Sequence, residues 1–126
     1  MNFARMRSLM DRLPSARRHV EIELSRATKC TQQLTGMPSG GGGGNSGDSF
    51  VRYIEAKDAL SALLQELQSL RDEAEPLIDA LPDSIQRTVM KLLYIDGYEA
   101  HKIAVELHYS EGHIFRLLRM AEAEIG

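Results

Sequence analysis

The chain has 126 residues, of which 43% are hydrophobic and 26% are charged, a balance typical of a globular protein with one modest core. Its single cysteine, Cys30, excludes an intramolecular disulfide and a zinc site built on several cysteines, and fits a reducing compartment. No apolar run approaches the roughly 18 residues that span a bilayer, and no signal-peptide pattern follows the charged start, so we expect a soluble cytoplasmic protein without a membrane partner.

The net charge of −3 is unevenly distributed along the chain. Residues 1–47 contain seven Lys and Arg against three Asp and Glu, which gives +4. Residues 48–80 contain three against eight (−5), and residues 81–126 contain five against seven (−2). Because no broad positive field exists, any contact with nucleic acid has to use a local basic face.

The first predicted element is a helix between Pro14 and a glycine-rich stretch. Its apolar positions recur at spacings of four, three, four and three, which places them on one stripe of the helix: Val20, Leu24, Ala27, Thr31 and Leu34. Pro14 is expected to mark the start of this helix, because proline suits a first helical turn. Residues 3–12 are predicted to form a separate short helix.

The segment TGMPSGGGGGNSGDS, residues 35–49, contains seven of the ten glycines in the chain. Such a stretch is not expected to sustain a helix or a strand. It lacks the Gly-Lys-Ser/Thr ending of a phosphate-binding loop, and no strand is predicted before it. We therefore interpret residues 35–49 as a flexible connector.

A second, longer helix is predicted after the connector, capped by Asp48 or Ser49. Its apolar positions alternate in steps of three and four, the repeat of a coiled-coil seam: Tyr53, Ala56, Leu60, Leu63, Leu67, Leu70, Ala74, Leu77 and Leu81. Pro76 is expected to kink or break this helix near Glu75, because it removes the amide hydrogen bond to Asp72. The two seamed helices form an antiparallel hairpin or pair with a second copy, and the pattern alone does not choose between these.

Three shorter helices are predicted from Pro82 onward. The first opens at Asp83 and Ser84, ends at Gly97, and has this apolar face: Ile85, Val89, Leu92 and Leu93. The second runs from about Glu99 to Leu107, with these residues turned inward: Ile103, Ala104 and Leu107. The third runs from the N-cap Ser110 to about Ile125.

The spacing of the last two helices is typical of a helix-turn-helix. In that motif the helices cross closely, so a small residue in the first packs beside an aliphatic residue about ten positions later. Ala104 and Ile114 fit that pair. On a helical wheel the last helix has an inward side, with Ile114, Leu117, Leu118, Ala121 and Ile125. Its outward side carries Gly112, Arg116 and Arg119, flanked by His113 and Phe115.

The outward side carries chemistry suited to DNA. Arg116 and Arg119 can read guanine or clamp a phosphate, and Phe115 can contact a thymine methyl group. Ser110 and the amides of the first turn can meet a backbone phosphate. The sequence therefore favours a nucleic-acid interface over a solvated helix face.

Metal and enzyme chemistry are not predicted. The histidines His101, His108 and His113 lack a partnering cysteine or paired carboxylate that would complete a metal shell. No arrangement of Ser, His and Asp or of Cys and His has a recognisable catalytic motif. We expect no enzymatic activity, no metal and no cofactor.

The segment LPDSIQRTVMKLLYIDGYEAHKIAVELHYSEGHIFRLLRMAEAEI, residues 81–125, resembles region 4 of primary-type sigma factors, whose helix-turn-helix reads an upstream promoter element. It is closer still to sigma-like transcriptional regulators of phages and prophages, the ArpU and RinA type. The resemblance implies a bacterial cell as the location and these groove-facing residues: Ser110, Glu111, His113, Arg116 and Arg119. It also implies that Lys102 lies near the DNA backbone. His108 stands where a glycine is common at the turn.

We therefore predict an all-α protein with a helical hairpin or coiled-coil arm at residues 1–80 and a three-helix, helix-turn-helix domain at residues 81–126. The expected function is sequence-specific binding of double-stranded DNA as a homodimer, which regulates transcription. The candidate DNA-contacting residues are Lys102, Ser110, Glu111, Gly112, His113, Phe115, Arg116 and Arg119. Two alternatives stay open, a module that docks on RNA polymerase or another regulator, and a DNA-packaging subunit similar to a small terminase.

Overall fold

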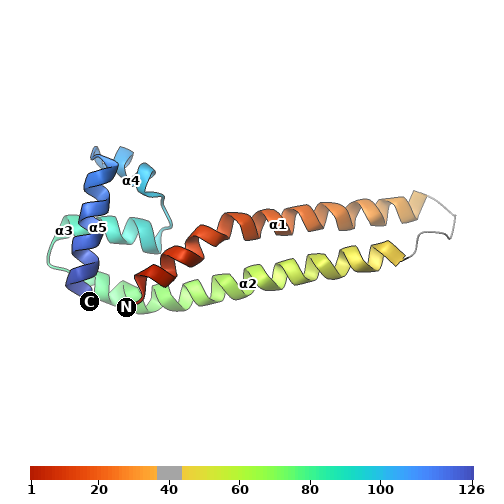
Figure 1. The fold of residues 1–126 in the computed structure, drawn as a ribbon, viewed down its shortest axis with the longest axis horizontal. Coiled ribbons are helices and arrows are strands. Elements are labelled where there is room, and N and C mark those ends of the chain that lie inside the picture. Colours follow the sequence, from red (N-terminus) through yellow and green to blue (C-terminus); the bar gives the residue numbers. More distant parts are fainter. Residues whose placement is uncertain (37–43) are drawn as a thin grey trace. The chain divides into compact units, whose positions relative to one another are not determined.

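The computed structural model of the protein describes residues 1–36 and 44–126. These residues form only helices and their connections: α1 (Phe3–Gly36), α2 (Gly44–Asp79), α3 (Ser84–Met90), the π-helical segment η2 (Lys91–Ile95), α4 (Ala100–Leu107) and α5 (Glu111–Ile125) (Figure 1). The predicted all-α class is thereby confirmed for the described residues. Within the same ranges, none of the helices combines the length and the apolar character that a membrane-spanning segment needs.

The chain separates into two compact units, and both long helices contribute to each. Unit 1 comprises Met1–Met10 and Glu66–Gly126, and unit 2 comprises Asp11–Gln65. These units do not coincide with the division predicted between residues 80 and 81. Residues 1–10 and 66–80 group with the C-terminal helices, because contacts between residues far apart in the sequence join them.

The helix α1 begins earlier than predicted. It is one helix from Phe3 onward, so residues 3–12 are not separate and Pro14 lies inside the helix instead of starting it. Asn2 caps the first turn, because its side chain accepts the amide of Arg5 at 3.0 Å. The turns before Pro14 are held in place by the buried side chains of Met6 and Leu9, which outweigh the hydrogen bond that proline removes.

The seam of α1 also differs from the predicted stripe. Its buried and half-buried residues recur in steps of three and four: Met6, Leu9, Leu13, Ala16, Val20, Glu23 and Ala27. Glu23 thus occupies the place predicted for Leu24, which is 45% exposed. The reason is that the helix keeps the register set by its first turns. The predicted seam residues Thr31 and Leu34 lie outside the residues whose side chains are described.

The seam of α2 follows the prediction closely. Nearly all of the expected residues are buried or half-buried: Tyr53, Ala56, Leu60, Leu63, Leu67, Leu70, Ala74 and Leu81. The exception is Leu77, which is 42% exposed, while Ile78 is fully buried in its place. No break occurs near Glu75, and Pro76 lies inside the helix, because Ala74 and Ile78 anchor the chain on both sides of it.

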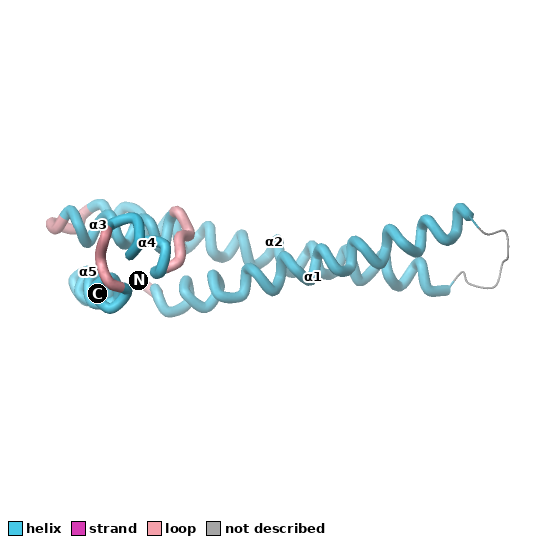
Figure 2. Tube along the Cα trace, turned by 90° about the horizontal axis from the view of Figure 1, so that it is seen from above, coloured by secondary structure: helices cyan, strands magenta, loops and turns pink. Residues whose placement is uncertain are grey.

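The start of α2 and the connector before it differ from the prediction. The helix begins at Gly44, so Asp48 and Ser49 lie within it and do not cap it. Glycine disfavours a helix by only about 1 kcal/mol per residue, which a long helix tolerates at its end. Of the predicted connector at residues 35–49, residues 37–43 lie outside the described residues. Within unit 2, the two long helices run side by side in opposite directions (Figures 1 and 2).

The core of unit 1 draws apolar side chains from every helix in it. Its buried residues are Phe3, Met6, Leu9, Leu67, Ala74, Ile78, Leu81, Val89, Met90, Tyr94, Ile103, Ala104, Ile114, Leu117, Leu118 and Ala121. The ring centres of Phe3 and Tyr94 lie 4.9 Å apart. The amino group of Met1 donates to the carbonyl oxygen of Gly126 at 3.1 Å, so residues 1 and 126 lie side by side.

A polar network around Tyr94 ties the first turns of α1 to α5. Arg7 donates to the hydroxyl oxygen of Tyr94 at 2.7 Å, and the hydroxyl donates to the carboxylate of Glu122, which also pairs with Arg7. Burial raises the pKa of the Tyr94 phenol, and its bond to Glu122 raises it further. The network therefore holds a neutral phenol between a cation and an anion.

The helix formed by α3 and η2 ends as predicted but presents a different face to the core. Asp83 caps it by accepting the amide of Ile85 at 2.9 Å, and Ile85 itself is 42% exposed while Gln86 is buried. Arg71 donates to the carbonyl oxygen of Tyr94 at 2.7 Å, which satisfies an acceptor in the π-helical turn. Gly97 has a φ of +76°, as expected for the residue that ends this helix.

Candidate nucleic-acid interface

The turn between α4 and α5 is short and tightly hydrogen-bonded. His108 directly follows the last residue of α4, Leu107, and has a φ of +60° and a ψ of +38°, in the left-handed region. The amide of Tyr109 donates to the carbonyl oxygen of Ala104 at 2.9 Å. Ser110 caps α5, because its hydroxyl oxygen accepts the amide of His113 at 3.2 Å. The predicted ends of these two helices are confirmed.

His108→Gly is expected to stabilise the protein by about 0.5–1 kcal/mol. A left-handed conformation costs a residue with a Cβ about 1–2 kcal/mol, whereas glycine adopts it freely and loses about 0.5–1 kcal/mol in chain entropy. The matched control is Val105→Gly in the exposed face of α4, where glycine is expected to destabilise. Urea denaturation followed by circular dichroism measures both, and a destabilised His108→Gly variant contradicts the explanation.

The inward faces of α4 and α5 are those predicted from the sequence. Ile103 and Ala104 of α4 are buried, and so are four residues of α5: Ile114, Leu117, Leu118 and Ala121. Leu107 and Ile125 are half-buried. α5 packs against both α3 and α4. These contacts fix the rotation of α5 about its axis and thereby decide which residues face outward.

The outward face of α5 combines two arginines with apolar side chains. Arg116 and Arg119 are exposed, and neither forms an ion pair with any residue in the described ranges. Phe115 is 48% exposed, and Met120 is 52% exposed. A Cβ placed on Gly112 would have nothing within 4 Å, so the surface is open at the start of the helix. The interface thus presents two cations that are free to contact a ligand.

The remaining candidate residues are exposed or half-buried, and several are engaged within the protein. The ammonium of Lys102 lies 4.6 Å from the centre of the Tyr98 ring. Glu111 places a carboxylate oxygen 3.5 Å from Nδ1 of His101, between α5 and α4. His113 packs edge-to-face against Tyr109, with ring centres 4.8 Å apart. Ser110 and His113 therefore shape the turn, whereas the arginines have no such role.

Sequence reasoning missed two exposed apolar residues, one on α5 and one on α4. Met120 follows Arg119 on α5, and Val105 on α4 is 61% exposed. The helical wheel already placed Met120 off the inward side, and that signal was sufficient to find it. Val105 lies between Ala104, which is buried, and Glu106, which is exposed. The helical pattern of α4 did not require the residue at position 105 to be buried. Met120 adds apolar surface next to Arg119 on α5.

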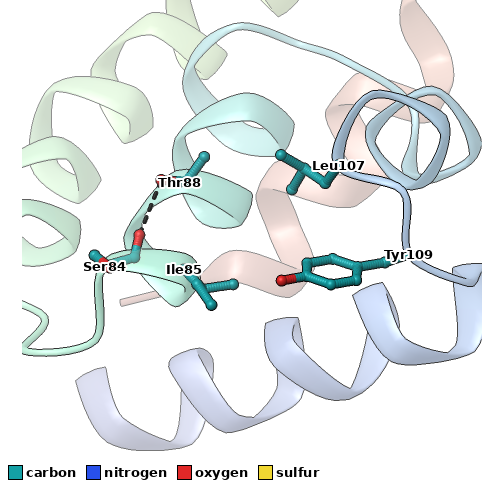
Figure 3. A pocket seen from close by; sticks show the side chains of 5 residues that line it. All are labelled: Ser84, Ile85, Thr88, Leu107 and Tyr109. Carbon is teal, nitrogen blue, oxygen red and sulfur yellow. Dashed lines mark hydrogen bonds between the residues drawn. The ribbon is translucent and has the colours of Figure 1, made fainter.

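A shallow hollow of about 150 Å³ lies beside the turn. It is lined by Ser84, Ile85, Thr88, Leu107 and Tyr109 (Figure 3). Tyr109 extends toward Ile85, and the hydroxyl of Thr88 donates to the carbonyl oxygen of Ser84 at 2.9 Å. In the part of the chain that the structure describes, no three His, Cys, Asp or Glu side chains are grouped so that they could hold a metal.

Residues 21–126 match the model of a protein family whose description reads Protein of unknown function (DUF1492). The chain belongs to this family. The DUF1492 match includes the whole of α2 and of the three helices that follow, and therefore every residue of the candidate interface. No curated protein and no solved structure matches the chain.

Proposed function

We propose that the protein binds double-stranded DNA sequence-specifically through α5, as a homodimer, and thereby regulates transcription. In this proposal the helices from α3 to α5 act as a helix-turn-helix domain, with α5 in the major groove, and the two long helices act as an arm. The observation that carries the proposal is the pair of exposed guanidiniums, Arg116 and Arg119, on the outward face of α5.

The geometry of the turn supports the helix-turn-helix interpretation. Ala104 is 5% exposed and Ile114 is fully buried, which suits the small and aliphatic partners of a close helix crossing. The left-handed His108 and the cap at Ser110 let α4 and α5 be joined by only three residues, 108–110. A helix that follows a turn this short has one fixed outward face, as a recognition helix needs.

The spacing of the two arginines suits neighbouring base pairs. Residues three apart on a helix are separated by about 4.5 Å along its axis, close to the roughly 3.4 Å between base pairs. Each guanidinium can therefore contact a guanine edge or a phosphate on adjacent steps. Phe115, which precedes Arg116 and is 48% exposed, offers an apolar contact to a thymine methyl group.

The acidic residues of α5 are expected to repel DNA phosphates less strongly than their number implies. Glu122 is held by Arg7 and the hydroxyl of Tyr94, so its charge is already compensated inside the protein. Glu111 lies in the first turn, close to His101. The phosphates would thus be attracted by the free guanidiniums of Arg116 and Arg119 and repelled by only part of the negative charge on α5.

The test is binding of the full chain to DNA fragments selected from a random pool. Arg116→Ala and Arg119→Ala are each expected to weaken binding to the selected site by about 5- to 150-fold, which corresponds to 1–3 kcal/mol per contact. The matched controls are Arg12→Ala and Arg18→Ala, which remove the same charge from exposed positions of unit 2. The proposal would be rejected if the control variants weakened binding as much as the variants of Arg116 and Arg119. It would also be rejected if no DNA sequence were selected from the random pool.

A second candidate function is docking of α5 on a protein such as RNA polymerase or another regulator. The observation that favours it is the exposure of Phe115 and Met120, at 48% and 52%, beside the arginines. An apolar contact is insensitive to salt, whereas DNA binding weakens steeply as salt rises. Binding to purified polymerase that persists at high salt, without DNA binding, would favour this second function.

A further inference from the structure

One carboxylate of α5 lies at helical-neighbour spacing from an arginine of the candidate interface. Side chains three or four positions apart on a helix are neighbours, and opposite charges at these spacings attract each other. Glu122 is three positions after Arg119. The other acidic residues of α5, Glu111 and Glu124, are at least five positions from both Arg116 and Arg119. Glu122 is therefore the carboxylate of this helix that is placed to pair with an arginine of the interface.

Glu122 lies at the border between the inward and the outward side of α5. At about 100° per residue, it stands about 40° from the buried Leu118 and about 60° from the exposed Arg119 on the helical wheel. The side chain of Glu122 is 20% exposed. From this border the carboxylate can turn inward, toward the core of unit 1, or outward, toward Arg119.

The structure holds this carboxylate on the inward side. The hydroxyl of Tyr94 donates to Oε1 of Glu122, and Nη1 of Arg7 donates to the same oxygen. Arg7 also donates to the hydroxyl oxygen of Tyr94 at 2.7 Å, so the three groups form one closed network. Among the described residues, no ion pair joins Glu122 to Arg119. The inward partners thus hold the carboxylate that Arg119 would otherwise attract.

The two inward partners differ in what they contribute. Tyr94 is fully buried, and burial together with the bond to Glu122 raises the pKa of its phenol, which therefore stays neutral. Arg7 supplies the positive charge of the three-residue network, and a charged donor makes a hydrogen bond roughly twice as strong as a neutral one does. Removing the charge of Arg7 is thus expected to weaken the hold on Glu122, with Tyr94 left as a neutral donor.

We propose that Arg7 keeps Arg119 free for DNA by holding Glu122, so that α1 prevents an autoinhibitory ion pair within α5. The proposal rests on the proposed function, because it assigns a regulation to the helix that would read DNA. Arg7 is a positioning residue here, since it acts through Glu122 and not by contact with DNA. Arg116 has no acidic residue three or four positions away, so only one of the two guanidiniums is subject to this control.

The first test is binding of the selected DNA site by charge-matched variants of the full chain. Arg7→Met is expected to weaken binding by about 3- to 10-fold. This range lies between the about 2-fold preference of an exposed ion pair at helical spacing and the about 5- to 150-fold loss expected for Arg119→Ala. Adding Glu122→Gln is expected to restore the affinity, because the competing carboxylate is removed. Adding Glu124→Gln instead gives the same net charge but leaves Glu122 charged, so it is expected to restore nothing.

A recovery that is specific to position 122 separates this competition from two simpler effects. A general effect of net charge would be corrected equally by Glu124→Gln. A merely structural role of Arg7 would be made worse by Glu122→Gln, because the network would lose a second member. The proposal is overturned if the two double variants bind DNA equally, or if Glu122→Gln brings no recovery.

The second test needs no DNA. Phenylglyoxal modifies guanidinium groups, and mass spectrometry of the peptides gives the rate of modification at each arginine. The side chain of Arg7 is 48% exposed, so Arg7→Met is expected to leave unit 1 folded. In this variant Arg119 is expected to react about 2-fold more slowly than in the wild type, because a carboxylate now pairs with it. Arg116, the internal reference, is expected to react at an unchanged rate.

The reactivities also separate this proposal from the proposed function. Any result other than a selective slowing of Arg119 overturns the proposal, including a rise at both arginines, which unfolding would cause. If the chain selects no DNA while Arg119 slows as expected, the proposed function is rejected and the competition for Glu122 is supported.

Discussion

Deletion of residues 1–10 is expected to leave the helices from α3 to α5 largely unfolded. Phe3, Met6 and Leu9 are at most 5% exposed, and burying each such side chain contributes about 1.5–3 kcal/mol. The loss of three approaches the 5–15 kcal/mol that stabilises a typical domain. Thermal denaturation followed by circular dichroism measures the effect.

The control for this deletion replaces exposed residues of the same segment, Arg5→Ala with Ser8→Ala. Arg5 pairs with Glu66 at 2.9 Å, but both side chains are more than two-fifths exposed, so the pair is expected to contribute little. A deletion variant that melts at the same temperature as this control contradicts the inclusion of residues 1–10 in unit 1.

Tyr94→Ala is expected to destabilise unit 1 by about 3–5 kcal/mol, the usual effect of removing a fully buried aromatic side chain. The ring packs on Phe3, and its hydroxyl joins Arg7 to Glu122. Tyr94→Phe keeps the ring and leaves Arg7 and Glu122 paired directly, so it is expected to destabilise by only about 1 kcal/mol. Urea denaturation measures both variants, and equal losses would contradict this division between packing and hydrogen bonding.

The same residue gives the sign of a pH dependence. Because the pKa of Tyr94 is raised in the folded protein above its ordinary value of 10.0, the unfolded chain releases this proton first as the pH rises. The contribution of Tyr94 is therefore complete below pH 10 and is lost above it. Tyr94→Phe is expected to show a shallower fall in stability above pH 10 than the wild type.

Local signals were sufficient to predict the last two helices. Ser110 is a capping residue, Gly97 can adopt a positive φ, and the inward residues recur with the period of a helix, so each boundary depends on neighbouring residues alone. The outward exposure of Arg116 and Arg119 followed from the same period. His108 adopts a left-handed conformation, which glycine adopts more readily than a residue with a Cβ.

Contacts between distant residues could not be predicted from one sequence. Arg7 and Glu122 are 115 positions apart, so nothing in the local pattern joins residues 1–10 to α5. The place of Glu23 in the seam of α1 was missed because a leucine follows it, and apolar periodicity favoured Leu24. Pro14 was expected to start a helix because the buried Met6 before it was not recognised as part of the same core.

The salt dependence of DNA binding tests the role of α5 most directly. The slope of log affinity against log salt concentration reports the number of phosphate contacts, at about 0.9 per contact. If Arg116 and Arg119 both meet phosphates or the groove, the variant lacking both is expected to lose specific binding and to reduce the slope by up to about two units. A variant with the affinity and the slope of the wild type would contradict the assignment of α5 as the DNA-reading helix.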